Sequence, residues 1–274
     1  MGRRIAILFH ERMPREDLGN YNISRLIPVW EADGHAVTLL FGTAERAPAD
    51  LVFVHVDLSV VPDEYLQFAA AYPASVNGRV RDIRKSAYSP NPLRPGDPWI
   101  GPVIVKSERN HGGTPEARHG LPRLDGQEVA PLFRSQLDYL VLDRLSDVPE
   151  AWFSSPDLLV QGFTPELEDG LFHVRNYQFL GDWSLGVRMA SNEPIVSVET
   201  KVASEPCSVP EEIVAERHRL GFDYGKFDFV LHDGRPLLLD VNKTLGGRSL
   251  HRAPDPVLAA RHAAKARALY PFFP

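Results

Sequence analysis

Two apolar runs near the C-terminal end of the chain, residues 227–231 and 236–241, are separated by the polar tetrapeptide His-Asp-Gly-Arg. An Asp-Gly pair between two such runs is typical of a β-hairpin, because glycine readily adopts the positive φ that a tight turn requires. The second run is rich in leucine and contains Asp240 near its end, which indicates a buried strand that carries a carboxylate. The pattern therefore predicts two antiparallel strands joined by a turn at Asp233 and Gly234.

Oxygen-bearing side chains occupy matching positions on this predicted hairpin. Side chains alternate between the two faces of a strand, so Asp240 and Asn242 share one face, and Asp228 lies across from them if the strands pair in register. Carboxylate and amide oxygens suit a hard cation such as Mg²⁺. The alternative is that the two aspartates cap an exposed hairpin edge, although a carboxylate on a buried strand needs a partner.

The N-terminal part of the chain shows the pattern of a parallel α/β unit. Residues 4–9, 34–41 and 50–56 predict strands, whereas residues 23–33 and 62–71 have helical spacing, with Pro28 inside the first helix. Strands that alternate with helices predict an open parallel sheet. The first strand is followed by His-Glu-Arg-Met-Pro rather than by a G-x-G-x-x-G loop, which excludes a dinucleotide site at that position.

The remaining patterns predict an α/β protein in three parts. Strands are expected over residues 102–106, 157–165, 172–180 and 183–189, and helices over 131–145, 210–220 and 251–270. Residues 89–101, before the first of these strands, are rich in proline and glycine and predict a loop. We expect a small parallel-sheet unit at 1–75, a second part at 76–160 and a third part, with the metal site, at 161–274.

Composition narrows the classes of function. The net charge of −6 over 274 residues argues against a dedicated nucleic-acid binder, whose affinity depends on Lys and Arg. The single cysteine, Cys207, excludes an internal disulfide and fits a reducing compartment. The apolar run after the first four residues is too short for a signal peptide or a membrane span. We therefore expect a cytoplasmic protein that binds neither nucleic acid nor membranes.

Two lysines stand in segments that could meet phosphate. Lys106 ends the predicted strand 102–106, and the loop after it contains Gly112 and Gly113, whose free backbone N–H groups could cradle an anion. The lysine precedes the glycines here, whereas in a Walker loop it follows them. The alternative to a phosphate-binding loop is an ordinary surface loop. Lys85 is the last basic residue of the most basic run of the chain, residues 79–86, for which the alternative is a solvated helix face.

The order of these features resembles the ATP-grasp superfamily: a strand ending in Lys106 with a glycine loop, then residues 160–163, then Asp228, and finally Asp240 with Asn242. The resemblance covers roughly the last two-thirds of the chain and implies an ATP-grasp fold, in which two α+β subdomains grip a nucleotide. The N-terminal unit resembles the pre-ATP-grasp domain that usually precedes it. The family usually has Glu at the position of Asp240 and an acidic residue at that of Gln161.

The resemblance also implies roles for individual residues. Those expected to contact the nucleotide are Lys85 and Lys106 at the phosphates with the loop of Gly112 and Gly113, the adenine hinge Gln161, Gly162 and Phe163, which would act mostly through backbone groups, and Glu168 at the ribose. Those expected to hold Mg²⁺, or Mn²⁺ in its place, are Asp228, Asp240 and Asn242. Those expected to face the acyl phosphate or the substrates are Lys226, Arg175 and Arg248. The alternative for Arg175 is a cross-strand ion pair with an acid such as Asp182.

Members of this family typically use ATP to convert a carboxylate into an acyl phosphate, which an amine or a thiol then attacks. The resemblance therefore implies an ATP- and Mg²⁺-dependent carboxylate–amine ligase, with the glycine loop closing over the site to exclude water. It implies small-molecule or peptide carboxylates and amines as substrates, and a homodimer, because related proteins are often dimers. Three alternatives stay open: a nucleotide-binding regulator or scaffold, a kinase acting on a hydroxyl or through a histidine such as His111, and a metallohydrolase using Asp228 and Asp240.

Replacing Lys106 by alanine should weaken ATP binding far more than replacing Lys201, a lysine outside these motifs. The expected cause is the loss of a charge-assisted hydrogen bond to phosphate. Isothermal titration calorimetry on both variants measures the two effects. Equal losses of affinity would contradict a phosphate-binding role for Lys106.

Overall fold

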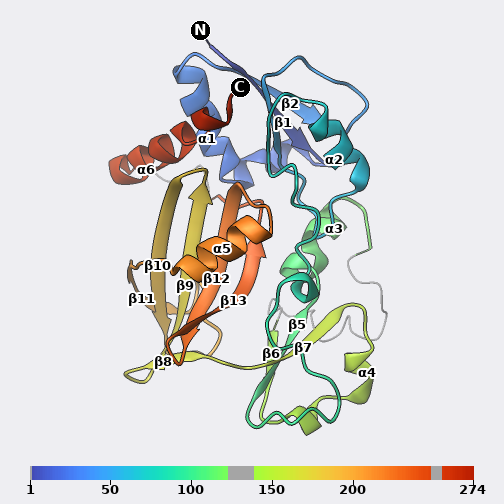
Figure 1. The fold of residues 1–274 in the computed structure, drawn as a ribbon, viewed down its shortest axis with the longest axis vertical. Coiled ribbons are helices and arrows are strands. Elements are labelled where there is room, and N and C mark those ends of the chain that lie inside the picture. The colour runs from blue at the N-terminus through green and yellow to red at the C-terminus, as the bar shows by residue number, and fades with distance from the viewer. Residues whose placement is uncertain (1, 123–138, 248–254) are drawn as a thin grey trace.

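The computed structural model describes residues 2–122, 139–247 and 255–274. Its strands form three sheets, which Figure 1 shows as a blue unit at the top, a yellow and orange sheet below it, and a smaller green sheet beside that one. In the described ranges, no helix combines the length and the apolar character needed to cross a membrane. The arrangement is an α/β fold, as the sequence pattern predicted.

The N-terminal unit is a four-stranded parallel sheet with the strand order β2-β1-β3-β4. Its central strands are buried on both faces, where Ile7 packs with Trp30 and Leu8 packs with Tyr65. A parallel sheet requires such cover on both sides, and the predicted open parallel sheet is confirmed. Its elements are β1 (Arg4–Phe9), η1 (Arg15–Asn20), α1 (Ile23–Ala32), β2 (Ala36–Phe41), β3 (Leu51–Val54), α2 (Asp63–Ala70) and β4 (Ser75–Val76).

The small sheet places β5 (Val103–Ser107) between two antiparallel neighbours, β6 (Tyr139–Leu142) and β7 (Leu158–Gly162). The predicted helix over 131–145 is wrong for residues 139–142, which pair with β5, and residues 131–138 lie outside the described ranges. Helical spacing in an apolar stretch did not outweigh this pairing. The short helices nearby are η2 (Lys85–Ala87), η3 (Asn110–Gly113), α3 (Thr114–Arg118), η4 (Leu145–Asp147) and α4 (Glu150–Phe153).

The large sheet has the order β11-β10-β9-β12-β13, and β8 pairs with β9. One face is covered by α5 and carries a cluster of aromatic rings that includes Tyr177, Phe179, Phe227 and Phe229. Side chains alternate along a strand, so this packing turns the intervening residues to the opposite face. The elements are β8 (Glu166–Glu168), β9 (Leu171–Leu180), β10 (Trp183–Ser191), β11 (Lys201–Pro206), α5 (Glu211–Arg219), β12 (Tyr224–His232) and β13 (Arg235–Asn242).

The hairpin of β12 and β13 forms as the sequence predicted. Its turn has positive φ at Asp233 (49°) and Gly234 (74°). Asp228 pairs with Asp240, whereas Phe229 pairs with Leu238, so Leu239 is an extra residue that forms a β-bulge. A bulge redirects the strand and its side chains, and this one lies beside the two aspartates.

The C-terminal helix returns to the N-terminal unit. The helix α6 (Pro256–Arg267) packs against α1, and the indole N–H of Trp30 donates to the carbonyl of Ala266 at 2.8 Å. A final turn, η5 (Tyr270–Phe272), lies beside it. The strands β4 and β7 each run across one of the predicted part boundaries, at 75 and 160. The three parts therefore share elements and helix packing.

Asn77 ties the parallel sheet to the large sheet. Its side chain is fully buried, its φ is 57°, and its amide donates to the carbonyl of Tyr224 at 2.8 Å. Its Oδ1 accepts hydrogen bonds from the backbone N–H groups of Asp223 and Tyr224 at 2.9 and 3.0 Å. One side chain thus satisfies three backbone groups of Asp223 and Tyr224, at the start of β12, which an apolar residue could not do.

Replacing Asn77 by alanine should lower the free energy of unfolding by about 2–4 kcal/mol, because buried backbone groups lose their partners. Asn91 is the matched control, since it also has positive φ (56°) but is exposed. Urea denaturation followed by circular dichroism measures both variants. A similar loss in Asn91→Ala would show that backbone strain, rather than hydrogen bonding, explains the effect.

Candidate functional site

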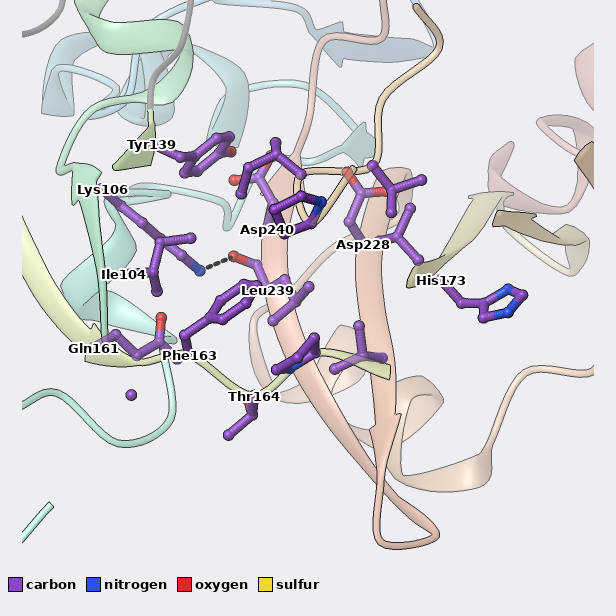
Figure 2. A pocket seen from close by; sticks show the side chains of 17 residues that line it. Ile104, Lys106, Tyr139, Gln161, Phe163, Thr164, His173, Asp228, Leu239 and Asp240 are labelled. Carbon is purple, nitrogen blue, oxygen red and sulfur yellow. Dashed lines mark hydrogen bonds between the residues drawn. The ribbon is translucent and has the colours of Figure 1, made fainter. Parts of the chain in front are cut away.

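A pocket lies between the small sheet and the large sheet. One wall comes from β5 and β7, with Ile104, Lys106 and Gln161, and the other comes from β9, β12 and β13. Figure 2 shows Lys106 reaching from the small sheet toward the hairpin that carries Asp228 and Asp240. The two walls combine apolar side chains with charged groups, which is the composition of many small-molecule sites.

The two aspartates face each other across the hairpin, as predicted, and each has its own cation. Lys85 contacts Asp240 at 2.5 Å, and the hydroxyl of Tyr88 donates to the same oxygen at 3.0 Å. Lys226 contacts Asp228 at 2.7 Å, and the amide of Asn176 donates to the other Asp228 oxygen. Lys85 is almost completely buried, so its pair with Asp240 is shielded from water.

The surroundings give the two carboxyl groups different pKa values. Burial is the largest influence on Asp228 and raises its pKa; Lys226 acts to lower it and the negative charge of Asp240 to raise it, and the net change is upward. Burial also acts to raise the pKa of Asp240, but Lys85, together with Lys226 and His111, lowers it below its ordinary value. Asp240 is therefore the more firmly ionised of the two.

Lys106 lies on the pocket face of β5 with only 3% of its surface exposed. Its ammonium donates to the carbonyl of Leu239, the bulged residue, at 3.3 Å, which Figure 2 shows as a dashed line. Burial, aided by repulsion from Lys85, lowers the pKa of Lys106 to about 8. A lysine with this pKa is still mainly charged at neutral pH and gains from an incoming anion.

The third predicted metal ligand, Asn242, is buried near the end of β13. Its Oδ1 accepts a hydrogen bond from the backbone N–H of Thr244 at 2.8 Å, and it is not among the residues that line the pocket. Within the described ranges, no group of three or more His, Cys, Asp or Glu side chains could hold a metal ion. A metal here would therefore depend on the two aspartates and on ligands of another kind.

Comparison with solved structures identifies the arrangement of these sheets. A RimK-domain ATP-grasp protein from Sphaerobacter thermophilus is similar with a TM-score of 0.56 and 16% identity, covering 98% of this chain and 99% of its own. The ATP-grasp ligase PsnB, in complex with a minimal precursor, is similar with a TM-score of 0.55 and 15% identity, over 97% and 98% of the two chains. The chain has the ATP-grasp fold.

A third ATP-grasp neighbour, the D-alanine–D-alanine ligase of Bacillus anthracis, has a TM-score of 0.51 and 11% identity over 99% of this chain and 96% of its own. No family model and no curated protein matches the chain. With sequence identities of 11–16%, the similarity to these structures establishes the fold of the chain but not its reaction. The coverage extends over the N-terminal unit as well.

Two predicted residues lie on the other face of the large ATP-grasp sheet. Arg175 directly precedes Asn176, which pairs with Asp228, so alternation turns Arg175 away from the aspartates. Arg175 instead contacts Glu166 at 2.8 Å, and not Asp182, the acid suggested by the sequence. Glu168 contacts Arg188 and does not line the pocket. Neither residue has the position predicted for it, and Arg248 lies outside the described residues.

The glycine loop is also placed differently from the prediction. Gly112 and Gly113 are buried in η3 with positive φ, and they do not line the pocket. The adjacent Asn110 donates its backbone N–H to the hydroxyl of Ser59 at 2.9 Å, which fixes the loop to the N-terminal unit. In this structure the loop does not line the pocket, and its closure over bound substrates stays a prediction.

The predicted hinge residues Gln161, Gly162 and Phe163 do line the pocket. A Cβ on Gly162 would lie 2.4 Å from the ring of Trp99, so a larger side chain cannot fit there. The backbone N–H of Phe163 donates to the carbonyl of Pro102 at 3.0 Å, so this group is already engaged. The predicted adenine hinge would act mainly through backbone groups, and the N–H of Phe163 is therefore not free to donate to a base.

Sequence reasoning missed Tyr88 and Asn176, which hold Asp240 and Asp228 in place. Asn176 could have been recognised only from the pairing of β9 with β12, where it stands opposite Asp228. Tyr88 lies three residues after Lys85, between the basic run and the predicted loop at 89–101, where the sequence pattern predicted no element. Neither residue carries a local motif, so only tertiary contacts reveal them.

ATP affinity should fall as the pH rises above about 8, because Lys106 has a pKa of about 8 in the free protein. Bound phosphate favours the charged form of Lys106 and therefore raises the pKa of this lysine. Above pH 8 the lysine of the free protein is mainly neutral, so ATP binding takes up a proton. The affinity for ATP then falls by up to about tenfold per pH unit. Below about pH 8 Lys106 is already charged in the free protein, so it causes no change of ATP affinity with pH. Calorimetry between pH 7 and 10 measures this profile.

Lys106→Met is the control for this profile, because it keeps the length of the side chain and has no titrating group. It should bind ATP more weakly at every pH and lack the slope above pH 8. Parallel profiles for the wild-type protein and the variant would assign the slope to another group.

Proposed function

We propose that the protein is an ATP- and Mg²⁺-dependent ligase, which activates a carboxylate as an acyl phosphate for attack by an amine or a thiol. The observation that carries this proposal is the pairing of Asp228 and Asp240, each with a lysine of its own, at a pocket that Lys106 also lines. Phosphoryl transfer depends mainly on positioning and on neutralising negative charge. The ATP-grasp fold supports the same conclusion.

The lysines have distinct tasks in this proposal. Lys106 reaches into the pocket from β5 and would donate to the nucleotide phosphates. Lys226, which is the least buried of the three, would face the transferred phosphoryl group and the acyl phosphate. Lys85 holds Asp240 and would contact phosphate only by exchanging that partner. Fixed cations lower the cost of bringing a polyanion to a carboxylate substrate.

The residues present fit a divalent cation. Asp228 and Asp240 supply two carboxylates on one face of the hairpin, and Asn242 is a third candidate that would have to release Thr244. Oxygen donors of this kind suit Mg²⁺ or Mn²⁺, whose other ligands commonly come from phosphates and water. When bound, the ion would screen the negative charge of the triphosphate during transfer.

The substrates are proposed as small-molecule or peptide carboxylates and amines. PsnB, one of the similar structures, is described as a ligase in complex with a minimal precursor. The pocket itself offers both apolar walls and cations, which suits a nucleotide next to an acid. We further propose that no nucleic acid is involved, since the net charge is −6.

Incubation with ATP, Mg²⁺, a panel of carboxylic acids and hydroxylamine tests the ligase proposal. Hydroxylamine traps an acyl phosphate as a hydroxamate, so one acid should give both ADP and hydroxamate. Asp240→Asn should reduce both products at least about a hundredfold, because it removes a charge at the proposed metal site. Asp143→Asn, which changes an exposed aspartate, should leave both unchanged.

The other outcomes point to different functions. ADP release that needs no carboxylic acid, with phosphate recovered on a hydroxyl or a histidine, would indicate a kinase. Tight ATP binding without ADP release under any acid would indicate a regulatory or scaffold protein. Either result would exclude the proposed ligase reaction. Asparagine is preferred to alanine at position 240 because it leaves Lys85 a polar partner in the buried pair.

A further inference from the structure

Asp240 receives its hydrogen bonds on a single oxygen. Among the described residues, the ammonium of Lys85 donates to Oδ1 at 2.5 Å, and the hydroxyl of Tyr88 donates to the same atom at 3.0 Å. Asp228 divides its partners instead, because the amide of Asn176 donates to Oδ1 and a lysine contacts Oδ2. The two aspartates of the pocket are therefore held in different ways.

Both donors come from one short turn, which is fixed to the segment after β5. The backbone N–H of Lys85, at the start of η2, donates to the carbonyl of Glu108 at 3.0 Å, and that of Tyr88 donates to the carbonyl of Lys85 at 3.3 Å. The carboxylate of Glu108 accepts from the backbone N–H of Ser86 at 3.2 Å. The ring of Tyr88 is buried in the same apolar cluster as Phe227. Packing as well as hydrogen bonding therefore holds the hydroxyl of Tyr88 in place.

The second oxygen of Asp240 is open to the pocket. Asp240 lines the pocket with 17% of its side chain exposed, on the strand next to that of Asp228 (Figure 2). Its Oδ2 has no donor among the described residues, yet it is not one of the buried side-chain atoms that lack a partner, so a ligand can reach it. A carboxylate oxygen accepts about two hydrogen bonds, which Lys85 and Tyr88 already supply to Oδ1. An approaching cation would therefore meet Oδ2 alone.

We propose that Tyr88 is a positioning residue, which keeps Oδ1 of Asp240 engaged so that this aspartate binds a divalent ion through Oδ2 alone and the site selects Mg²⁺ over Ca²⁺. The inference rests on the proposed use of Mg²⁺ and ATP. Mg²⁺ needs an octahedral set of single oxygens, whereas Ca²⁺ takes about 6–8 oxygens and often both from one carboxylate. Lys85 could exchange Asp240 for a phosphate, but the neutral hydroxyl of Tyr88 would remain on Oδ1.

ATP binding in the presence of each ion tests the inference on the wild-type protein. ATP with saturating Mg²⁺ should bind about tenfold or more tightly than ATP with saturating Ca²⁺, because Asp240 withholds the second oxygen that Ca²⁺ would use. Isothermal titration calorimetry measures both affinities without any turnover. Equal affinities would overturn the role of Tyr88 while leaving the ATP-binding site intact.

Tyr88→Phe removes the hydroxyl and keeps the ring in its apolar cluster. Asp240 can then offer both oxygens, so ATP should bind more weakly with Mg²⁺ but at least as tightly with Ca²⁺, and the ratio of the two affinities should fall about tenfold. Tyr270→Phe is the matched control and should keep the wild-type ratio, since the hydroxyl of Tyr270 also donates to an aspartate, Asp33, at 2.5 Å, but neither residue lines the pocket. An unchanged ratio in folded Tyr88→Phe, or equal losses with both ions, would also overturn the inference.

Failure of the proposed function gives a separate result. If the wild-type protein binds ATP with neither ion, the ATP site itself is wrong and the inference falls with it. If the Mg²⁺ preference is present and falls in Tyr88→Phe, but no acid yields a hydroxamate, the role of Tyr88 stands and only the ligase reaction is excluded. The comparison of the two ions on the wild-type protein can refute the inference even if Tyr88→Phe does not fold.

Discussion

Two carboxylates that face each other across one pair of strands, Asp228 and Asp240, impose the main constraint on this structure. Two like charges in a largely buried position repel each other, and each needs a cation to remain ionised. Lys226 supplies one from the same hairpin, whereas Lys85 comes from 155 residues earlier in the chain. Breaking such a buried pair typically costs about 3–5 kcal/mol. The hairpin therefore depends on the docking of a distant segment.

The same charges explain why the pocket suits a nucleotide. Lys85, which neutralises Asp240, repels Lys106, whose hydrogen-bond partner among the described residues is the backbone carbonyl of Leu239 and not a carboxylate. Burial and repulsion between Lys85 and Lys106 leave Lys106 poorly compensated, and they lower its pKa to about 8. An incoming phosphate would relieve this repulsion. The site is thus prepared electrostatically for an anion, and two carboxylates lie next to the place where that anion would bind.

The hairpin also connects the site to the N-terminal unit. After Asn242 the chain continues to Lys243, which donates to the carbonyl of Leu58, and to Thr244, whose hydroxyl donates to Asp57 at 2.5 Å. Asp57 and Leu58 lie in the segment that follows β3 of the parallel sheet. Together with the hydrogen bonds of Asn77, they place the N-terminal unit and the carboxylate pair in one packed body. A change in either part is therefore expected to be felt in the other.

Local patterns in the sequence determined the elements that depend on local physics. Strand alternation, the Asp-Gly turn and the proximity of Asp228 to Asp240 follow from backbone preferences over a few residues. The parallel sheet followed from the order of strands and helices. The resemblance assigned Lys106 and Gln161 to a nucleotide site; the structure places both on the wall of one pocket, and their roles stay predictions.

Tertiary structure alone decided which side chains complete the site. Arg175 and Asn176 are neighbours in sequence, yet only Asn176 shares a face with Asp228, because the parity of β9 is set by its pairing with β12. The glycine loop is fixed by Ser59 of another unit, and Tyr88 reaches Asp240 across 152 residues. A sequence pattern shows that side chains alternate between the two faces of a strand. Which face contacts a partner depends on the packing of segments that are distant in the chain.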